Sequence, residues 1–135
     1  MSNFYMMVGL PASGKSEYAK NLATGFTRLR SSDELRSELL GSVEDMSKNT
    51  VIFDLLHSLI KSDLYDGHDT IYDATNLKGR YRKEFLDKLE ILDCRKICIY
   101  VKCSSELCEE RNSNRDRVVT PSAIVTGKQI GRAHV

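Results

Sequence analysis

The stretch GLPASGKS, from Gly9 to Ser16, decides the fold of this chain. It fits the pattern G-x-x-x-x-G-K-[ST] at every fixed position. Small residues allow the backbone to curl so that several N–H groups point inward at phosphate oxygens. Lys15 can reach the outer phosphates of a nucleotide, and the hydroxyl of Ser16 can bind Mg²⁺. The stretch therefore predicts a phosphate-binding loop whose contacts come from Gly9, Ala12, Ser13, Gly14, Lys15 and Ser16.

The segments on either side of this loop have the pattern that such a loop requires. Residues 4–8 (FYMMV) form a short apolar run without helical period, which is typical of a buried parallel strand. From Lys15 to Leu22 the pattern becomes helical, and Thr24 and Gly25 end it. The start of this helix adds a positive dipole end to the loop. The order strand, loop, helix favours bound phosphate over a glycine-rich turn without a ligand.

The rest of the chain alternates strands with helices. Further strands are predicted at residues 26–30, 70–73 and 97–101, and further helices at about 31–40, 45–65, 78–92 and 104–111. Such alternation predicts an α/β fold, in which a parallel sheet carries helices on both faces in three layers. Ligands of these sheets bind at the carboxyl ends of the strands. His57 falls between the apolar positions of its helix, so we expect it on the polar side, at the surface or partly packed.

Length, charge and cysteine content limit the class of protein. A chain of 135 residues has room for one domain. Its net charge of +1 provides no general attraction to nucleic acid, so any such contact needs a local basic patch. No C-x-x-C pair occurs, and Cys94 and Cys98 fit buried strand positions as reduced thiols. Because there is neither an apolar run of ~18 residues nor a secretory signal, we expect a cytoplasmic protein outside the membrane.

An acidic residue follows the second predicted strand, at the same sheet edge as the phosphate loop. Asp33 lies in the segment SSDELR, which ends at Arg36. There it can take a proton from an acceptor hydroxyl, and Arg36, one helical turn later, can hold Asp33 or an acceptor anion. The same pattern also suits a helix-capping aspartate with a solvated arginine. The residues alone leave both interpretations open.

Two more polar segments follow later strands. Asp73 ends the third strand, where an acid can stand near the hydration shell of Mg²⁺ or cap the next helix. The polar run RNSNRDR carries Arg111, Arg115 and Arg117 after the last predicted helix. Arginines on a mobile lid can neutralise charge on a transferring phosphoryl group, whereas a solvated helix end is the simpler interpretation. Beside a phosphate loop, the lid interpretation is favoured.

Four segments in order, GLPASGKS, SSDELR, YDATNL and ERNSNR, resemble the phage-type polynucleotide 5′-kinase domain and its relatives among ATP-binding P-loop kinases. The resemblance covers about residues 4–124. It implies that Lys15 and Ser16 serve ATP and Mg²⁺, and that Asp33 is the general base on a 5′-hydroxyl. It further implies that Arg36 positions Asp33 and the neighbouring acceptor phosphate.

The resemblance also assigns residues around the reacting phosphate. Asp73 would support the active site behind the metal, with Asn76 nearby. Arg111 and Arg115 would contact ATP, with Arg115 as the lid arginine on the transferring phosphate. This chain has Glu34–Leu35 where the phage-type enzyme has an acidic residue and an aromatic one. The acceptor-side helix therefore lacks that ring for base stacking.

The leading interpretation is an ATP-dependent kinase that phosphorylates the 5′-hydroxyl of RNA or DNA. The base-reading N-K-x-D and switch D-x-x-G motifs of GTPases do not appear where that class needs them. A kinase for a small hydroxyl-bearing molecule would use the same loop, base and lid, and would differ only in its acceptor. An ATP-binding module without turnover is disfavoured, because Asp33 and Arg115 would then have no task. The sequence gives no indication of the oligomeric state.

The last residues of the chain differ in character from the rest. The segment IGRAHV at residues 130–135 is what a common sequencing-library adapter encodes in one frame (ATC GGA AGA GCA CAC GTC). We therefore expect a P-loop kinase domain over residues 1–124 and a non-native read-through tail over residues 125–135. On this hypothesis the domain is truncated at its C-terminus, and the native protein is longer.

Overall fold

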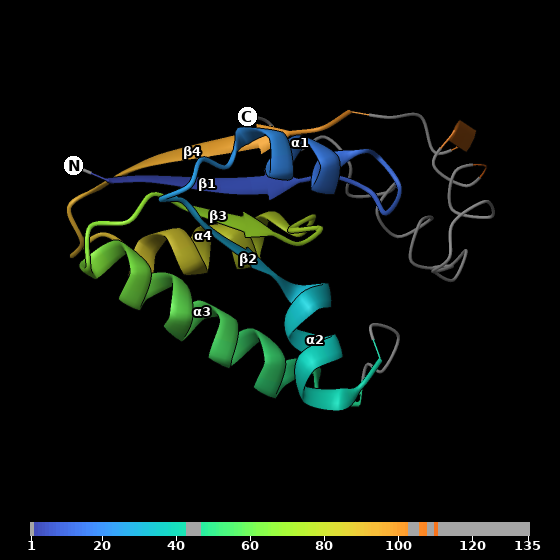
Figure 1. The fold of residues 1–135 in the computed structure, drawn as a ribbon, viewed down its shortest axis with the longest axis horizontal. Helices are drawn as coiled ribbons and strands as arrows, with labels where there is room; N and C mark the ends of the chain where they lie inside the picture. Colours follow the sequence, from blue (N-terminus) through green and yellow to red (C-terminus); the bar gives the residue numbers. More distant parts are fainter. Residues whose placement is uncertain (1, 43–46, 103–105, 108–109, 111–135) are drawn as a thin grey trace.

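Four parallel strands form the centre of the structure, a computed structural model that describes residues 2–42, 47–102, 106–107 and 110. The strands are β1 (Ser2–Val8), β2 (Arg28–Ser31), β3 (Thr70–Asp73) and β4 (Cys94–Tyr100). They lie in the order β2-β3-β1-β4 (Figure 1). Every pairing between them is parallel, so their carboxyl ends lie at one edge of the sheet. The predicted α/β fold of P-loop proteins is confirmed.

The helices between the strands begin and end largely where local signals predict. They are α1 (Lys15–Leu22), α2 (Ser32–Leu40), α3 (Asn49–Tyr65) and α4 (Gly79–Lys88). The Ser31 side chain accepts a hydrogen bond from Glu34 N at the start of α2, and Gly41 ends that helix with a φ of 76°. The helix predicted to reach residue 92 ends at Lys88, because the chain turns through residues 89–92 before β4. The helix predicted at 104–111 lies mostly outside the described residues.

The two faces of the sheet have separate cores. On one face, α2, α3 and α4 pack on alternate side chains of β1, which are Phe4, Met6 and Val8. On the other face, Ala19 of α1 packs on Met7 and Ile71. Figure 1 shows α3 and α4 on the lower side of the sheet. Because helices cover both faces, the predicted three-layer arrangement is present.

β1 and β3 are neighbouring strands whose connections leave on opposite faces of the sheet. The loop after β1 leads to α1, and the loop after β3 leads to α4. This divergence opens a crevice at the carboxyl ends of the two strands, which is where open α/β sheets bind ligands. The phosphate loop therefore begins at that crevice.

Cys94 and Cys98 are free thiols on β4 that pack against the larger core. They were expected to be buried, but both are only partly so. The reason is that β4 is the outermost strand of the described sheet on that side. Burial still raises the pKa of both thiols, which makes them poor nucleophiles near neutral pH.

Candidate active site

The phosphate loop is held at its start by close contacts with two neighbouring segments. Gly9 N donates a hydrogen bond to Thr75 O (3.1 Å), in the loop after β3. A Cβ atom on Gly9 would lie 2.8 Å from Ser13 Oγ and 3.1 Å from Val101 O. The contact with Ser13 Oγ is shorter than Cβ atoms show, and the contact with Val101 O is tight, so a larger residue at position 9 would displace its neighbours.

The middle of the loop has the alternating backbone conformation that binds anions. Ala12 and Gly14 adopt left-handed conformations, with φ values of 63° and 97°. Ser13 lies between them and donates its N–H to Leu10 O (3.1 Å). Residues that alternate in hand turn their N–H groups toward one concavity, which is how protein backbones cradle phosphate. The backbone of the loop therefore curls around a concavity, although the N–H of Ser13 is used within the loop itself.

Lys15, Ser16 and Asp73 come together at the start of α1. Ser16 Oγ donates a hydrogen bond to Asp73 Oδ2 (2.8 Å), and Lys15 Nζ lies 4.0 Å from Asp73 Oδ1. Asp73 Oδ1 is buried and accepts no hydrogen bond from the part of the chain that the structure describes. A carboxylate oxygen with a spare lone pair beside a hydroxyl is a donor set that suits Mg²⁺. The residues present therefore fit this ion.

On the acceptor side, α2 carries an aspartate that a buried arginine holds. Arg36 Nη1 donates a hydrogen bond to Asp33 Oδ1 (3.0 Å), and Nη2 donates to Asn49 Oδ1 (2.8 Å) at the start of α3. The Arg36 side chain is 4% exposed, whereas that of Asp33 is 37% exposed. The guanidinium thus fixes Asp33 from inside the protein while part of the carboxylate faces solvent. A solvated arginine, the alternative interpretation, does not describe this site.

The register of the sheet brings the phosphate-loop side and the acceptor side of the site to the same edge of the sheet. Ser31 at the end of β2 pairs with Asp73 at the end of β3, and Asp33 follows shortly after Ser31. The loop after β3 is fixed to β1, because Asn76 Nδ2 donates a hydrogen bond to Met7 O (2.8 Å). Asn76, expected near the metal, therefore connects two strand ends. Its φ of 49° is another left-handed conformation.

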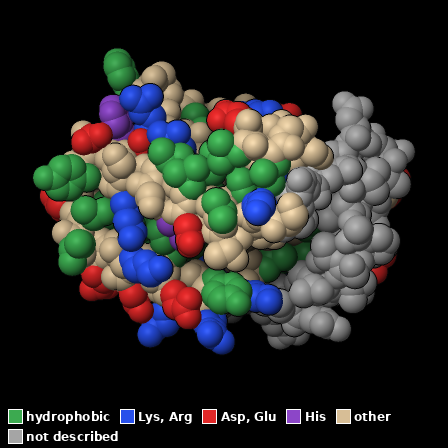
Figure 2. Space-filling view, turned by 90° about the horizontal axis from the view of Figure 1, so that it is seen from below, with side chains coloured by type: hydrophobic (Ala, Val, Ile, Leu, Met, Phe, Trp, Pro, Cys, Tyr) green, Lys and Arg blue, Asp and Glu red, His purple; other side chains and the backbone are tan. Residues whose placement is uncertain are grey.

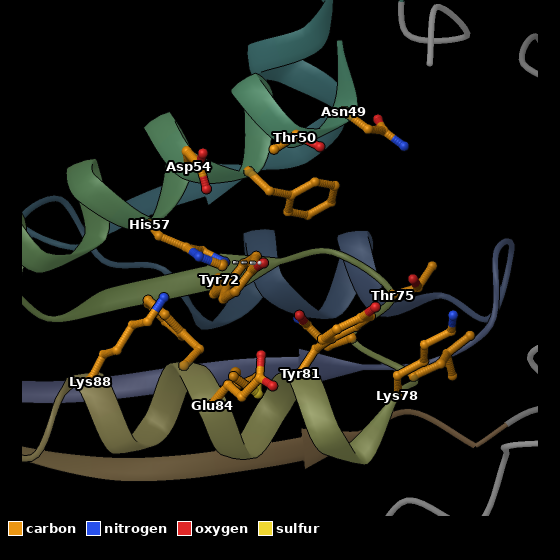
Figure 3. A pocket seen from close by; sticks show the side chains of 15 residues that line it. Asn49, Thr50, Asp54, His57, Tyr72, Thr75, Lys78, Tyr81, Glu84 and Lys88 are labelled. Atoms are coloured by element: carbon orange, nitrogen blue, oxygen red, sulfur yellow. Dashed lines mark hydrogen bonds between the residues drawn. The ribbon is translucent and has the colours of Figure 1, made fainter. Parts of the chain in front are cut away.

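A pocket of about 760 Å³ lies between α3 and α4, and Thr75 and Asn76 of the loop after β3 line it. Figure 3 shows His57 and Tyr72 within it, where His57 Nε2 lies 2.9 Å from the Tyr72 hydroxyl. The His57 ring stacks on Phe85, with 4.1 Å between ring centroids. Burial lowers the pKa of His57 to about 4, and the charge of nearby Lys88 adds to the effect. The imidazole is therefore neutral at pH 7.

The expectation that His57 lies on the polar side of its helix is wrong, although it is partly packed. α3 has two inward sides. One carries Ile52, Leu56 and Ile60 into the core, and the adjacent one carries Phe53 and His57 into the pocket. The spacing of four residues between Phe53 and His57 was the signal that could have predicted this second side.

Some predicted features lie outside the described residues. They are Arg111, Arg115 and the segment 125–135. Within the described ranges, no helix combines the length and apolar character needed to cross a membrane. The same part of the chain holds no group of three or more His, Cys, Asp or Glu side chains that could form a metal cluster.

Comparison with known proteins places this geometry in a family. A family model described as an AAA domain matches residues 4–133. The chain belongs to this family. This AAA domain has the fold of P-loop kinases, and the matched residues include the phosphate loop, Asp33 and Asp73.

Several solved structures share the fold at low sequence identity. A chain of the Pnkp1/Rnl/Hen1 RNA repair complex is 20% identical with a TM-score of 0.81, and the match covers 96% of the present chain and 43% of that chain. A gluconokinase from Sinorhizobium meliloti 1021 is 17% identical with a TM-score of 0.65, and the match covers 98% of the present chain and 78% of the gluconokinase chain. A sugar kinase from Janibacter sp. HTCC2649 is 16% identical with a TM-score of 0.67, and the match covers 100% of the present chain and 80% of the sugar kinase chain.

The extent of these matches differs between the relatives. The AAA domain spans less than half the length of the chain from the RNA repair complex, but most of the length of the two smaller kinases. No curated protein matches the chain significantly in sequence. At these identities the matches show the fold alone.

Proposed function

We propose that this AAA domain transfers the γ-phosphoryl group of ATP to a hydroxyl, namely the 5′-hydroxyl of a polynucleotide. The observation that carries the proposal is the pairing of two sites at one sheet edge. The phosphate loop with Lys15 and Ser16 lies on one side, and Asp33 with its buried partner Arg36 lies on the other. A loop for phosphate beside an oriented, partly exposed carboxylate is the arrangement that phosphoryl transfer to a hydroxyl requires.

The donor side binds and orients ATP. Gly9 N and Ser13 N donate hydrogen bonds within the protein, so the backbone N–H groups that would face the phosphates are others of the loop, such as those of Ala12 and Gly14. The Lys15 ammonium would neutralise charge on the outer phosphate oxygens. Ser16 and Asp73 would hold Mg²⁺, which when bound offsets the charge that develops on the phosphate oxygens. Asp73 also orients Ser16, because it accepts a hydrogen bond from the hydroxyl of that side chain. Arg111 and Arg115 are proposed to complete the phosphate contacts.

The acceptor side supplies the base. Asp33 accepts the proton of the acceptor hydroxyl while that oxygen forms a bond to the γ-phosphorus and the bond to the β,γ-bridging oxygen breaks, which releases ADP. Arg36 leaves only part of the carboxylate exposed, and this directs Asp33 toward the acceptor. Because Arg36 is also held by Asn49, the base keeps its position without a bound acceptor.

Two observations support the polynucleotide acceptor. The four motifs occur in the order and at the distances that resemble the phage-type polynucleotide 5′-kinase domain. In addition, the matched chain with a TM-score of 0.81 comes from an RNA repair complex. The second candidate is a kinase for a small hydroxyl-bearing molecule, which the shared fold with a gluconokinase and a sugar kinase supports.

Transfer of labelled phosphate tests both candidates. The chain is incubated with γ-labelled ATP, Mg²⁺ and a 5′-hydroxyl oligonucleotide. We expect label on the oligonucleotide, and a loss of about 10²- to 10⁴-fold in Asp33→Asn with ATP binding retained. Glu34→Gln, the exposed neighbouring acid, is the control and should keep its activity. Equal rates in wild type and Asp33→Asn would rule out the proposed base, and transfer to a polyol alone would favour the second candidate.

A further inference from the structure

The groove between α3 and α4 is continuous with the acceptor side of the candidate site. Asn49, which holds Arg36, lines one end of the groove. Thr75 lines it too, and its carbonyl accepts the hydrogen bond from Gly9 of the phosphate loop. Figure 3 shows Asn49 at the start of α3 and Thr75 in the loop after β3, on the same side of the pocket. A molecule in the groove would therefore reach the region where Asp33 and the phosphate loop meet.

Several aromatic rings line the groove. Tyr72 and Phe85 are 3% and 2% exposed and pack edge to face, so they form a rigid floor. Phe53 is partly buried on the α3 side, and Tyr81 is 56% exposed on the α4 side. Figure 2 shows hydrophobic side chains gathered among charged ones on this face of the molecule. Phe53 and Tyr81 thus provide ring surface that is still accessible to a ligand.

The charges around the groove indicate what kind of group it takes. Lys78 and Lys88 stand at its rim with Asp54 and Glu84, so the rim is balanced in charge. Such a rim gives no preference for a phosphate or a carboxylate. A polyol could hydrogen-bond the polar groups of the rim, but it has no planar π face to stack on the accessible rings. A flat ring with apolar faces and a polar edge fits better, because it can stack on rings and use the rim.

We propose that this groove binds the heterocyclic base of the acceptor, by stacking on Tyr81 and Phe53, while the sugar hydroxyl of that nucleotide faces Asp33. The inference rests on the proposed function and specifies its acceptor as a base-bearing one. It also provides the stacking surface that α2 lacks, because Leu35 is buried in the core and offers no ring. The group that the groove would recognise is a base attached to a sugar, which either a polynucleotide end or a free nucleoside can supply.

Removal of the base from the acceptor tests the groove. The kinase assay uses two 5′-hydroxyl oligonucleotides that differ only in the presence of the 5′-terminal base. We expect the abasic acceptor to raise KM about tenfold or more in the wild type. Tyr81→Ala should raise KM for the intact acceptor by a similar factor and leave KM for the abasic one unchanged. Phe53→Ala should act in the same direction.

Tyr65→Ala is the matched control, since Tyr65 is 81% exposed on α3 and does not line the groove. It should keep the wild-type difference between the two acceptors. If the wild type phosphorylates both acceptors with the same KM, the groove proposal is wrong while the kinase proposal stands. The same holds if Tyr81→Ala and Phe53→Ala retain the full difference.

A binding measurement separates failure of the groove from failure of the kinase. The Kd of the full chain is measured for a 5′-hydroxyl dinucleotide, for its abasic counterpart and for adenosine, without ATP. If no oligonucleotide is phosphorylated but binding depends on the base and on Tyr81, the groove stands and the polynucleotide kinase is wrong. Tyr81-dependent binding of adenosine alone supports the groove with a free nucleoside as its source. Equal Kd values for the intact and abasic dinucleotides overturn the groove.

Discussion

At the residue scale, Asp73 has more contacts with functional groups than a helix-capping acid would need. Its two oxygens face the Ser16 hydroxyl at 2.8 Å and the Lys15 ammonium at 4.0 Å, and its side chain is 8% exposed. In the structure α4 begins after Lys78 without a side-chain cap, so Asp73 does not cap that helix. A buried carboxylate is retained at such a place when a cation compensates it. We therefore attribute Asp73 to the phosphate and metal chemistry.

Asp73→Asn should raise the Mg²⁺ concentration needed for half-maximal phosphate transfer by about 10- to 100-fold. The amide keeps the size of the side chain and can still accept a hydrogen bond from Ser16, but it lacks the negative charge that attracts the ion. The measurement is a Mg²⁺ titration of the transfer rate at saturating ATP. Asp69→Asn, at the opposite end of β3, is the control and should leave the Mg²⁺ requirement unchanged. An unaltered titration in Asp73→Asn would exclude a role near the metal.

Arg36→Lys tests whether the fork of the guanidinium is needed, as distinct from its charge. Arg36 contacts Asp33 and Asn49 with separate nitrogens, at 3.0 and 2.8 Å. A lysine ammonium keeps the charge but is a single point that does not span both partners. We expect kcat to fall by about 10- to 100-fold, since a misplaced base reacts poorly. The variant's melting temperature is measured in parallel, and an unchanged kcat would show that Asp33 does not depend on this support.

At the element scale, the sequence predicted those helices and strands whose ends are set by local signals. α1 runs from Lys15 to Leu22 and β3 from Thr70 to Asp73, both as predicted. β4 begins earlier than expected, at Cys94, because the polar residues 94–96 pair with the start of β1. No local pattern marks such an extension, since the partner strand lies far away in sequence. The pairing of β4 with β1, which is a tertiary contact, therefore determines where β4 begins.

The candidate site follows the same division between local and distant contacts. Residues inside motifs, such as Lys15, Asp33 and Asp73, were recognisable because each motif is a continuous segment. Asn49 was missed, because its hydrogen bond with Arg36 joins side chains of two different helices, α2 and α3. The groove was missed for the same reason. Its rings come from α3, β3 and α4, and none of these segments has a motif of its own.

His57 should make stability depend on pH in a window that its pKa defines. Burial lowers its pKa from 6.5 to about 4, so the unfolded chain binds more protons than the folded one below pH 6.5. Stability is therefore full above pH 6.5 and is lost as pH falls from about 6.5 to about 4. His57 is partly exposed, so solvent screening reduces the loss to roughly 1–2 kcal/mol.

His57→Gln isolates this contribution. The amide can still hydrogen-bond the Tyr72 hydroxyl but does not titrate. Denaturant unfolding is measured for both proteins between pH 8 and pH 4.5. The free energy of unfolding of the wild type, taken relative to that of His57→Gln, should be constant from pH 8 to 7. It should fall below pH 6.5, because only the wild type has an imidazole to protonate at position 57. A difference that stays constant to pH 4.5 would contradict a buried neutral imidazole.

At the scale of the whole molecule, the two faces of the sheet are covered unequally. The face toward α3 and α4 has a core that includes Phe4, Ile60 and Phe85, whereas in the described part of the chain the other face has α1 over Met7 and Ile71. α1 also carries Lys15 and Ser16 in its first turn. The helix that covers the smaller core is therefore the one to which we assign nucleotide binding. Ligand binding should stabilise the part of the fold with the least packing of its own.

MgATP at 100 times its Kd should stabilise the domain by about 2.7 kcal/mol and raise its melting temperature by about 10 °C. Lys15→Met should lose most of this shift, because the variant keeps an apolar stem but not the ammonium that faces the phosphates. Lys20→Met, in the last turn of α1, is the control and should keep the full shift. Thermal melts with and without MgATP compare the shifts, so any effect of Lys15→Met on the unliganded protein cancels. A full shift in Lys15→Met would mean that nucleotide binds elsewhere, and the loop at Gly9–Ser16 would lose its assigned role.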